Sequence, residues 1–367
     1  MTKIVQVLSS VKITVACLFW LFVLTFWGTV AQVEHGLYAA QERYFYSFFF
    51  KAAGFFPFPG AQLVLWVLFF NLVASAVTHF IKLHHWRYVG LKISHFGVLI
   101  YFVAAFITFH VMQESNVHLL EGEGTNVSSS YHEWEMAYWK EPGNTREVTA
   151  CDVTKSKPGD ILPFTGVPWT ITVGQFYLNS AAYTKTQSVL RLLNGSGITL
   201  LEPKDMVKER EKNIAGGIFS LQISGEKNYT LLLYGGESQP TRVSINGQDY
   251  YFSLRHKRYA LPFIIQLKKF KAEFHPGTNV ASSYESMVEV VQPGARRDVR
   301  IYMNNPLRHK DYTFYQASYD VDAMGRQYST LAVVRNFGQV LPYIACFVVF
   351  FGLALHFLIA ALSRKHT

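Results

Sequence analysis

Four uninterrupted apolar stretches dominate the hydropathy pattern of the chain, three near its beginning and one near its end. They cover residues 13–30, 61–80, 93–112 and 337–362, and none contains Lys, Arg, Asp or Glu. About 20 apolar residues at ~1.5 Å rise per residue cover the ~30 Å hydrocarbon core of a bilayer. The first stretch is longer than the apolar part of a signal peptide, and further apolar stretches follow it. The pattern therefore predicts four transmembrane helices.

Residues 31–60 interrupt this apolar pattern with polar positions but are rich in Phe and Tyr. Pro57, Pro59 and Gly60 break any helix near the end of this segment. Aromatic rings with a polar edge favour the membrane interface. We therefore expect an aromatic loop that lies along the membrane surface.

Residues 113–335 contain no apolar run long enough for a span and instead alternate between apolar and polar positions. Period-two alternation with β-branched and aromatic residues predicts strands. Asn246-Gly247, between two such stretches, is a hairpin signal. The strongest stretches are 168–177, 229–234, 242–254, 261–274, 286–292, 299–303 and 311–319. The predicted fold class is an integral membrane protein with four transmembrane helices and a large mostly-β extracytoplasmic domain between helices three and four.

Composition and charge agree with this class. Only 16% of the residues are charged, whereas soluble domains have about 25%, and the mean hydropathy is +0.13. The net charge of +9 does not require a nucleic-acid partner, because basic residues gather at cytoplasmic helix ends. Lys82, Arg87 and Lys92 lie in the connector between the second and third spans, and Arg364-Lys365 follow the fourth.

These basic positions predict that both termini are cytoplasmic and that the large domain is in the periplasm or outside the cell. The protein is then expected in the cytoplasmic (inner) membrane. The expected domains are a membrane region over 1–112, an extracytoplasmic region over 113–335, and a last span with its basic tail over 336–367.

The extracytoplasmic region carries no motif of an active site. It has no phosphate-binding glycine loop, no Gly-x-Ser-x-Gly and no His-Glu-x-x-His. The three cysteines, Cys17, Cys151 and Cys346, form no Cys-x-x-Cys pair, so neither a thioredoxin-like centre nor a c-type haem attachment site is expected. The histidines of this region are dispersed and are expected to be surface or strand residues: His118, His132, His256, His275 and His309.

The histidines of the membrane region differ because an ionisable side chain inside a span is costly and calls for an explanation. His79 ends the second span and His95 begins the third. Imidazole binds haem iron and transition metals without carrying a charge. His95 lies beside Gly97, where a small residue allows a flat ligand or a second helix to approach closely. His95 is therefore the first candidate ligand and His79 a weaker one.

The other histidines of this region are weaker candidates. His84 and His85 lie in the connector beside Trp86 and are expected to be interfacial. His110 lies fifteen residues after His95, which is about 22 Å along a helix, so it cannot share a ligand site with His95. His356 is expected in the fourth span near the inner face.

The order of elements and several short motifs resemble the ResB family, also called CcsB, of system II cytochrome c biogenesis. The most specific motif is Asn304-Asn305-Pro306-Leu307 running into Tyr312-Thr313-Phe314-Tyr315-Gln316-Ala317-Ser318-Tyr319. Weaker motifs are Leu8 to Lys12, Ser94-His95-Phe96-Gly97, Glu121 to Gly124, Leu261-Pro262-Phe263 and Leu267 to Phe270.

The resemblance implies a function and partners. Proteins of this family pair with, or are fused to, a CcsA (ResC) protein that carries a tryptophan motif. The pair moves haem b from the cytoplasm across the membrane and presents it to apocytochrome c for covalent attachment, alongside thiol-reducing maturation proteins. A histidine of the third span helps ligate haem, and His95 is the matching position.

The chain departs from the fused members of the family because it has no Trp-Gly-x-x-Trp-x-Trp-Asp segment. We therefore expect a haem-transport or assembly subunit more than a catalyst by itself, with the second haem ligand supplied by the partner. Two alternatives stay open on the residues alone. One is a membrane-anchored scaffold with an external β domain, and the other is a haem-bearing, quinone-linked redox subunit in which His79 and His95 hold the iron.

Overall fold

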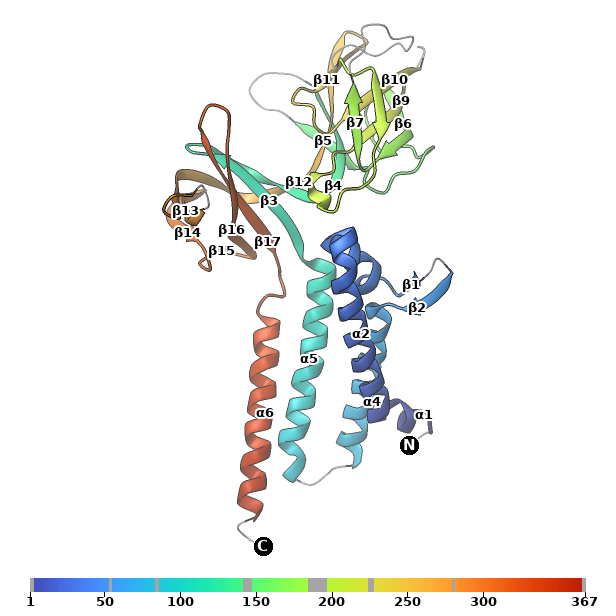
Figure 1. The fold of residues 1–367 in the computed structure, drawn as a ribbon, viewed down its shortest axis with the longest axis vertical. Coiled ribbons are helices and arrows are strands. Elements are labelled where there is room, and N and C mark those ends of the chain that lie inside the picture. The colour runs from blue at the N-terminus through green and yellow to red at the C-terminus, as the bar shows by residue number, and fades with distance from the viewer. Residues whose placement is uncertain are drawn as a thin grey trace. The chain divides into compact units, whose positions relative to one another are not determined.

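The computed structural model divides the chain into two compact units, which we describe separately (Figure 1). The helical unit comprises Met1–Gln113, His309–Tyr312 and Val334–Thr367. The β unit comprises Glu114–Arg308 and Thr313–Val333. The structure describes residues 3–52, 55–82, 86–140, 147–183, 197–223, 228–278 and 281–364.

The helical unit contains four long apolar helices, each long and apolar enough to cross a membrane. They are α2 (Val11–His35), α4 (Ala61–Lys82), α5 (Val89–Val111) and α6 (Leu341–Arg364). Three of them precede the large β region and one follows it, so the predicted fold class of a multi-pass membrane protein with a large β region is confirmed. The short α1 (Lys3–Leu8) precedes α2, and η2 (Trp86–Tyr88) precedes α5.

Helix ends follow backbone hydrogen bonding more than hydropathy. The N-cap of α2 is Ser10, whose hydroxyl accepts a hydrogen bond from the backbone N–H of Lys12. The helix continues past the apolar stretch through Gln32 and Glu34 and ends at Gly36, whose φ of 84° favours glycine. The hydropathy pattern could not show this extension, because polar residues continue a helix as readily as apolar ones.

One polar side chain connects the first two spans. Asn71 of α4 is buried, and its carbonyl oxygen accepts a hydrogen bond of 2.7 Å from the hydroxyl of Thr14. Its amide nitrogen donates to the carbonyl oxygens of Leu8 and Ser10, at the break between α1 and α2. The amide therefore satisfies backbone groups that the helix break leaves open.

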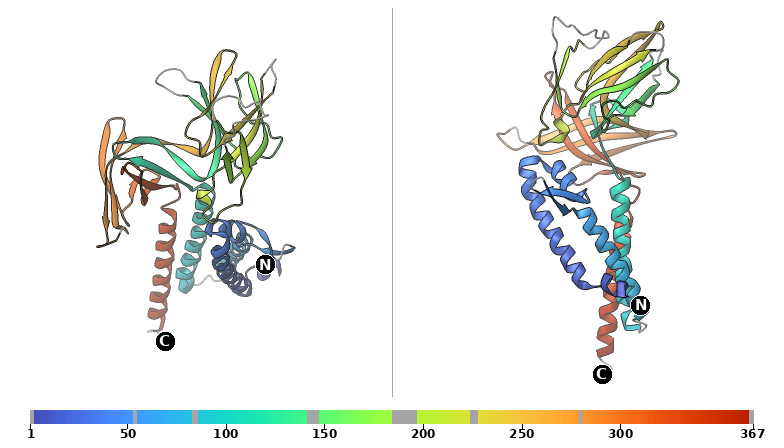
Figure 2. Two further views of the ribbon diagram at one scale, coloured as in Figure 1. Left: turned by 45° about the horizontal axis from the view of Figure 1, so that its top comes forward. Right: turned by 90° about the vertical axis from the view of Figure 1, so that its right-hand side faces the viewer.

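The aromatic segment after α2 forms compact structure. It contains α3 (Leu37–Ala40), the π-helix η1 (Gln41–Phe45) and a hairpin of β1 (Phe49–Ala52) and β2 (Phe56–Pro59). Tyr44 and Phe50 pack beside Leu24 of α2 in one buried cluster. The indole of Trp20 donates a 2.9 Å hydrogen bond to the carbonyl oxygen of Pro59. Figure 2 shows this hairpin beside the helices, at the end of α2 opposite to α1.

The β unit consists of one large antiparallel sheet and two small ones. The large sheet has the order β14-β13-β12-β4-β3-β17-β16-β15, with β11 paired to β12 and β5 to β4. The small sheets are β10-β9-β6 and β7-β8. The bounds are β3 (Gln113–Leu120), β4 (Gly124–Lys140), β5 (Val148–Asp152), β6 (Trp169–Tyr177), β7 (Ser180–Tyr183), β8 (Leu200–Pro203), β9 (Gly216–Ile223), β10 (Tyr229–Tyr234), β11 (Thr241–Ile245), β12 (Gln248–Phe274), β13 (Ala281–Gln292), β14 (Ala295–Tyr302), β15 (Leu307–His309), β16 (Tyr312–Val321) and β17 (Gln327–Arg335), and a short helix η3 (Arg210–Lys212) precedes β9.

The predicted hairpin at Asn246-Gly247 is confirmed. The two residues connect β11 to β12 with φ angles of 51° and 76°, the left-handed values that a two-residue hairpin turn requires. Ile245 pairs directly with Gln248 across the turn.

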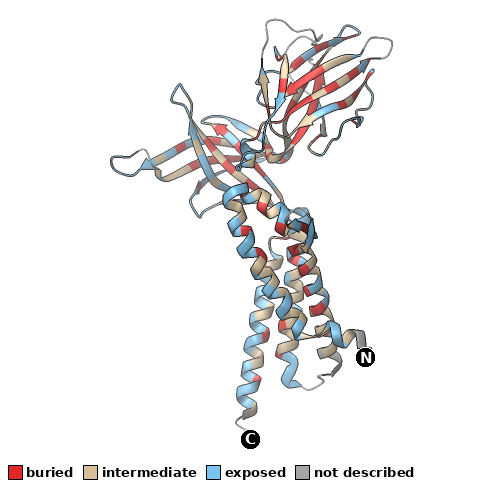
Figure 3. Cartoon of the chain, turned by 45° about the vertical axis from the view of Figure 1, so that its right-hand side comes forward, coloured by how far each residue is buried: buried red, intermediate tan, exposed pale blue. Residues whose placement is uncertain are grey.

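The core of the β unit lies where the β10-β9-β6 sheet covers β4, β11 and β12. Trp169 of β6 lies with its ring centroid 5.3 Å from that of Phe252 of β12, and Phe219 of β9 is fully buried in the same cluster. The two sheets therefore pack face to face in a two-layer, sandwich-like arrangement. Figure 3 shows the buried residues gathered on these strands, whereas the helices carry many exposed positions.

Candidate functional site

His95 lies on α5, within an apolar helix whose hydropathy and length suit a membrane span. It is half-buried, and its Nδ1 lies 2.9 Å from the carbonyl oxygen of Leu91, one helical turn earlier. A carbonyl oxygen only accepts, so this bond assigns the proton to Nδ1. The lone pair is then on Nε2, the nitrogen that would bind haem iron.

Helical spacing places His95 on the side of α5 that faces α4. Seven and eleven residues after His95, Phe102 and Phe106 make ring contacts with α4. The ring centroid of Phe102 lies 6.1 Å from that of Phe69, and that of Phe106 lies 5.5 Å from that of Trp66. Positions seven and eleven apart fall on one helix face. By this period His95 belongs to the face that α5 turns toward α4.

His79, the weaker candidate, lies near the end of α4. The two ring contacts define how the antiparallel helices α4 and α5 are aligned. In this alignment Ala76 of α4 is level with His95 of α5, and His79 is level with Lys92. The backbone of His79 is therefore about 4.5 Å along the helix axis from the level of His95. The side chain of His79, and all of His84 and His85, lie outside the described residues. A pair formed by His79 and His95 therefore stays a prediction.

Gly97 lies where α6 packs closely against α5. A Cβ at Gly97 would lie 2.8 Å from the backbone nitrogen of Val349 in α6, and a Cβ at Gly352 would lie 2.6 Å from the backbone nitrogen of Ser94. The hydroxyl of Ser94 donates within α5 to the carbonyl oxygen of Gly90. Of the two uses the sequence left open for Gly97, close approach of a second helix is the one observed.

His356 of α6 lies on this helix–helix contact, because a Cβ at Gly90 would be 2.4 Å from its backbone nitrogen. Its Nδ1 is buried and has no hydrogen-bond partner among the described residues. Gly97 is level with Val349 of α6, and Gly90 is level with His356. The backbone of His356 is therefore about 7.5 Å along the helix axis from the level of His95.

An aromatic groove lies along α4 and α5 toward the end where α5 meets β3. It encloses about 470 Å³ and has His110 in its lining. The imidazole of His110 lies with its ring centroid 4.4 Å from that of Phe106 and 5.0 Å from that of Phe109. Further rings of the wall are Trp66, Phe69, Tyr101 and Phe102. The sequence placed His110 at a helix end but gave no sign of the groove, which depends on how α4 packs.

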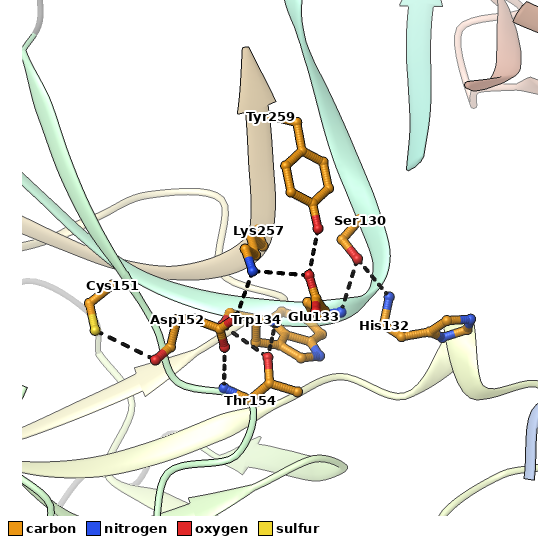
Figure 4. A network of polar contacts seen from close by, with 9 residues as sticks. All are labelled: Ser130, His132, Glu133, Trp134, Cys151, Asp152, Thr154, Lys257 and Tyr259. Carbon is orange, nitrogen blue, oxygen red and sulfur yellow. Dashed lines mark hydrogen bonds and ion pairs between the residues drawn. The ribbon is translucent and has the colours of Figure 1, made fainter. Parts of the chain in front are cut away.

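The β unit contains a cluster of charged side chains at a break in the sheet (Figure 4). Trp134 of β4 pairs with His256 of β12, yet the next pair is Ser129 with Arg258. Residues 130–133 thus bulge opposite the single residue Lys257.

Lys257 is the centre of this cluster. Its ammonium group lies 2.7 Å from Asp152 Oδ2 and 3.1 Å from Glu133 Oε2, and the hydroxyl of Tyr259 donates to the same Glu133 oxygen. The backbone N–H of Thr154 donates to Asp152 Oδ1. Each charged group of this cluster is therefore paired with another member, so the cluster presents no unpaired charge to a ligand.

Opposing causes set the pKa values of the cluster. Burial lowers the pKa of Lys257, but hydrogen bonds to Asp152 and Glu133 outweigh burial and raise it overall. Burial raises the pKa of Asp152, but hydrogen bonds from Lys257 and Thr154 lower it overall. Burial and the hydrogen bond to Glu133 raise the pKa of Tyr259 to about 12. These groups keep one protonation state near neutral pH.

The histidines of the β unit take part in strand packing where their contacts are described. The ring of His256 stacks 3.9 Å from Trp134, and burial lowers the pKa of His256. His118 stacks on Tyr328, and its Nδ1 lies 2.9 Å from the hydroxyl of Thr330. Within the described ranges, no group of three or more His, Cys, Asp or Glu side chains is placed to hold a metal ion. A haem iron needs only one ligand from each side, so single histidines remain the relevant candidates.

Sequence reasoning missed the Lys257 cluster because its members are distant in the chain. Glu133, Asp152 and Lys257 come from β4, β5 and β12, and strand register alone brings them together. Their local sequence carries no motif that would have shown it.

Part of the chain matches a known protein family. The sequence pattern of the ResB-like family matches residues 230–325, which run from β10 to the turn after β16. The chain is also 24% identical over 301 residues to Protein NrfI of Wolinella succinogenes. That alignment covers 80% of this chain and 29% of the relative, so the chain spans less than a third of its length. Residues 230–325 thus carry the sequence pattern of the ResB-like family, the family that the motif at residues 304–319 resembles.

Proposed function

We propose that the chain acts as the ResB-type subunit of a system II cytochrome c synthetase. It carries haem b as cargo from the cytoplasm across the inner membrane, together with a CcsA-type partner, and presents it for attachment to apocytochrome c. The observation that carries this proposal is the imidazole of His95, an intramembrane side chain whose Nδ1 is engaged by Leu91. Its Nε2 is the axial ligand that this chain offers to the iron.

The helical unit supports the same role through its charge distribution. Arg87 and Lys92 lie at the start of the third span, so the positive-inside rule makes this end cytoplasmic. His95 would then meet haem soon after its entry from the cytoplasm, and basic groups at this end suit the two propionates. The β unit would face outside, where apocytochrome c receives the haem.

The partner must complete the site. Histidine-ligated haem usually has two axial ligands, and the register of α5 with α6 places His356 about 7.5 Å along the axis from the level of His95. The second axial ligand and the tryptophan motif therefore come from the CcsA-type part of the synthetase.

The decisive experiment is co-expression with a CcsA-type protein, followed by absorption spectroscopy of the purified complex and an assay of holocytochrome c. We expect His95→Ala to lower the Soret absorbance of the complex and to lower holocytochrome c at least tenfold. In His95→Gly, added imidazole should restore the Soret band, which a purely structural defect would not allow. The matched control is Phe96→Ala, an exposed neighbour on the same helix turn.

Unchanged haem content and normal maturation in His95→Ala would overturn the ligand role and favour a scaffold function. A reversible redox midpoint in this subunit without its partner, lost in His79→Ala, would favour the quinone-linked alternative.

A further inference from the structure

We propose that the aromatic groove between α4 and α5 is a second haem station in the outer half of the membrane, with His110 as its iron ligand. This inference rests on the proposed function, because it takes haem as the cargo. It assigns a route to that cargo within this chain.

The groove has the chemistry of a site for a flat apolar ring. Its volume of about 470 Å³ lies within the range of small-molecule sites, ~300–1,000 Å³. Trp66, Phe69, Phe102 and Phe106 provide a wall of aromatic rings from both helices. Aromatic faces and edges favour contact with another planar π-system.

The groove continues the face of α5 on which His95 stands. Phe102 begins the groove seven residues after His95, about 10 Å further along the helix, and His110 ends it after about 22 Å. Haem that leaves His95 in the outward direction therefore meets an aromatic wall before it reaches a second imidazole.

His110 is exposed and is held at the groove by its ring contacts with Phe106 and Phe109. A lipid acyl chain could fill an apolar groove but makes no specific bond to an imidazole, whereas haem iron coordinates one. His35 supplies an internal comparison, since it ends α2 at the same end of the bundle but does not line the groove.

The test is a hemin titration of the full chain in lipid nanodiscs, followed by the Soret band of histidine-ligated haem. We expect the wild type to bind two hemins, His110→Ala and His95→Ala to bind one each, and the double variant to bind none. Ala105→Trp fills the groove from an exposed position and should also leave one hemin. His35→Ala should match the wild type.

A parallel titration with iron-free protoporphyrin IX separates ring binding from ligation. Ala105→Trp should abolish the binding of this probe to the groove, whereas His110→Ala should weaken it less than twofold.

Three outcomes would overturn the inference. One is equal hemin binding by His110→Ala and the wild type, with loss only in His95→Ala, which would leave the proposed function intact. Another is loss of bound phospholipid in Ala105→Trp without any change in hemin binding, which would make the groove a lipid site. Absence of histidine-ligated hemin from the wild type in nanodiscs would overturn this inference, whereas the proposed function is tested separately by the haem content of the complex with its partner.

Discussion

The helical unit and the β unit bring side chains together in different ways. In α5 the relevant positions follow one another at helical spacing, so His95, Phe102 and Phe106 share a face within a single element. In the β unit Glu133 and Lys257 are 124 residues apart and meet only through the pairing of β4 with β12.

This difference explains which unit a single substitution can alter easily. A single substitution on α5 alters a site that local sequence defines, whereas the cluster around Lys257 depends on the register of three strands. The helical unit therefore suits ligand binding, and the β unit has the more distributed, self-satisfied polar structure.

The largest effect is expected from Gly97→Leu. The new side chain would begin 2.8 Å from the backbone nitrogen of Val349, which cannot move without shifting α6. We expect about 3 kcal/mol of destabilisation, measured as loss of folded protein in a thermal unfolding assay in detergent. Phe96→Leu, at the exposed next position, should leave the midpoint unchanged. Equal loss in both variants would show that α5 does not depend on the small-residue contact.

A smaller effect is expected in the β unit from Lys257→Met. This change leaves Asp152 and Glu133 without their common cation, and partial solvent exposure limits the penalty to about 1–2 kcal/mol. Urea unfolding followed by tryptophan fluorescence would measure it. Lys271→Met, which breaks an exposed pair with Glu273, is the control and should leave the urea midpoint unchanged.

Asn246→Ala should cost about 1 kcal/mol, because alanine tolerates a φ of 51° less well than asparagine. The same urea assay would detect this change. An unchanged midpoint would mean that the turn adapts without strain, and Asn246→Gly provides the permissive control.

The smallest effect concerns Glu237, in the turn after β10, where burial raises the pKa of the carboxyl group to about 7. The folded protein keeps this proton to a higher pH than the unfolded chain. The associated stability is therefore fully present below about pH 4.5 and is lost as the pH rises through 7. Glu237→Gln should flatten this part of the stability profile between pH 5 and pH 8. Parallel profiles for the two proteins would contradict the raised pKa.

The sequence predicted the four spans and the β region because hydropathy and alternation are local properties. Helix ends were less predictable, since Gln32 and Glu34 continue α2 beyond its apolar stretch. The hairpin at Asn246 was visible because its turn chemistry is local as well.

In the candidate site, too, local features were predictable from the sequence and contacts between distant segments were not. His95 stood out as an imidazole in an uncharged span, but the neighbour of Gly97 could be identified only from the packing of α6. The groove beside His110 and the cluster around Lys257 depend on contacts between distant segments. Such contacts leave no periodic signal in the sequence.

The amide of Asn71 also constrains how the membrane region is assembled. Its partners, the hydroxyl of Thr14 and the carbonyl oxygens of Leu8 and Ser10, are synthesised 57 to 63 residues before it. Until α4 emerges from the ribosome, the break between α1 and α2 has to rely on water or on the translocon for these hydrogen bonds. The first two spans therefore leave the translocon most favourably as a pair, and Asn71→Leu should delay membrane integration of the first span in a cell-free insertion assay.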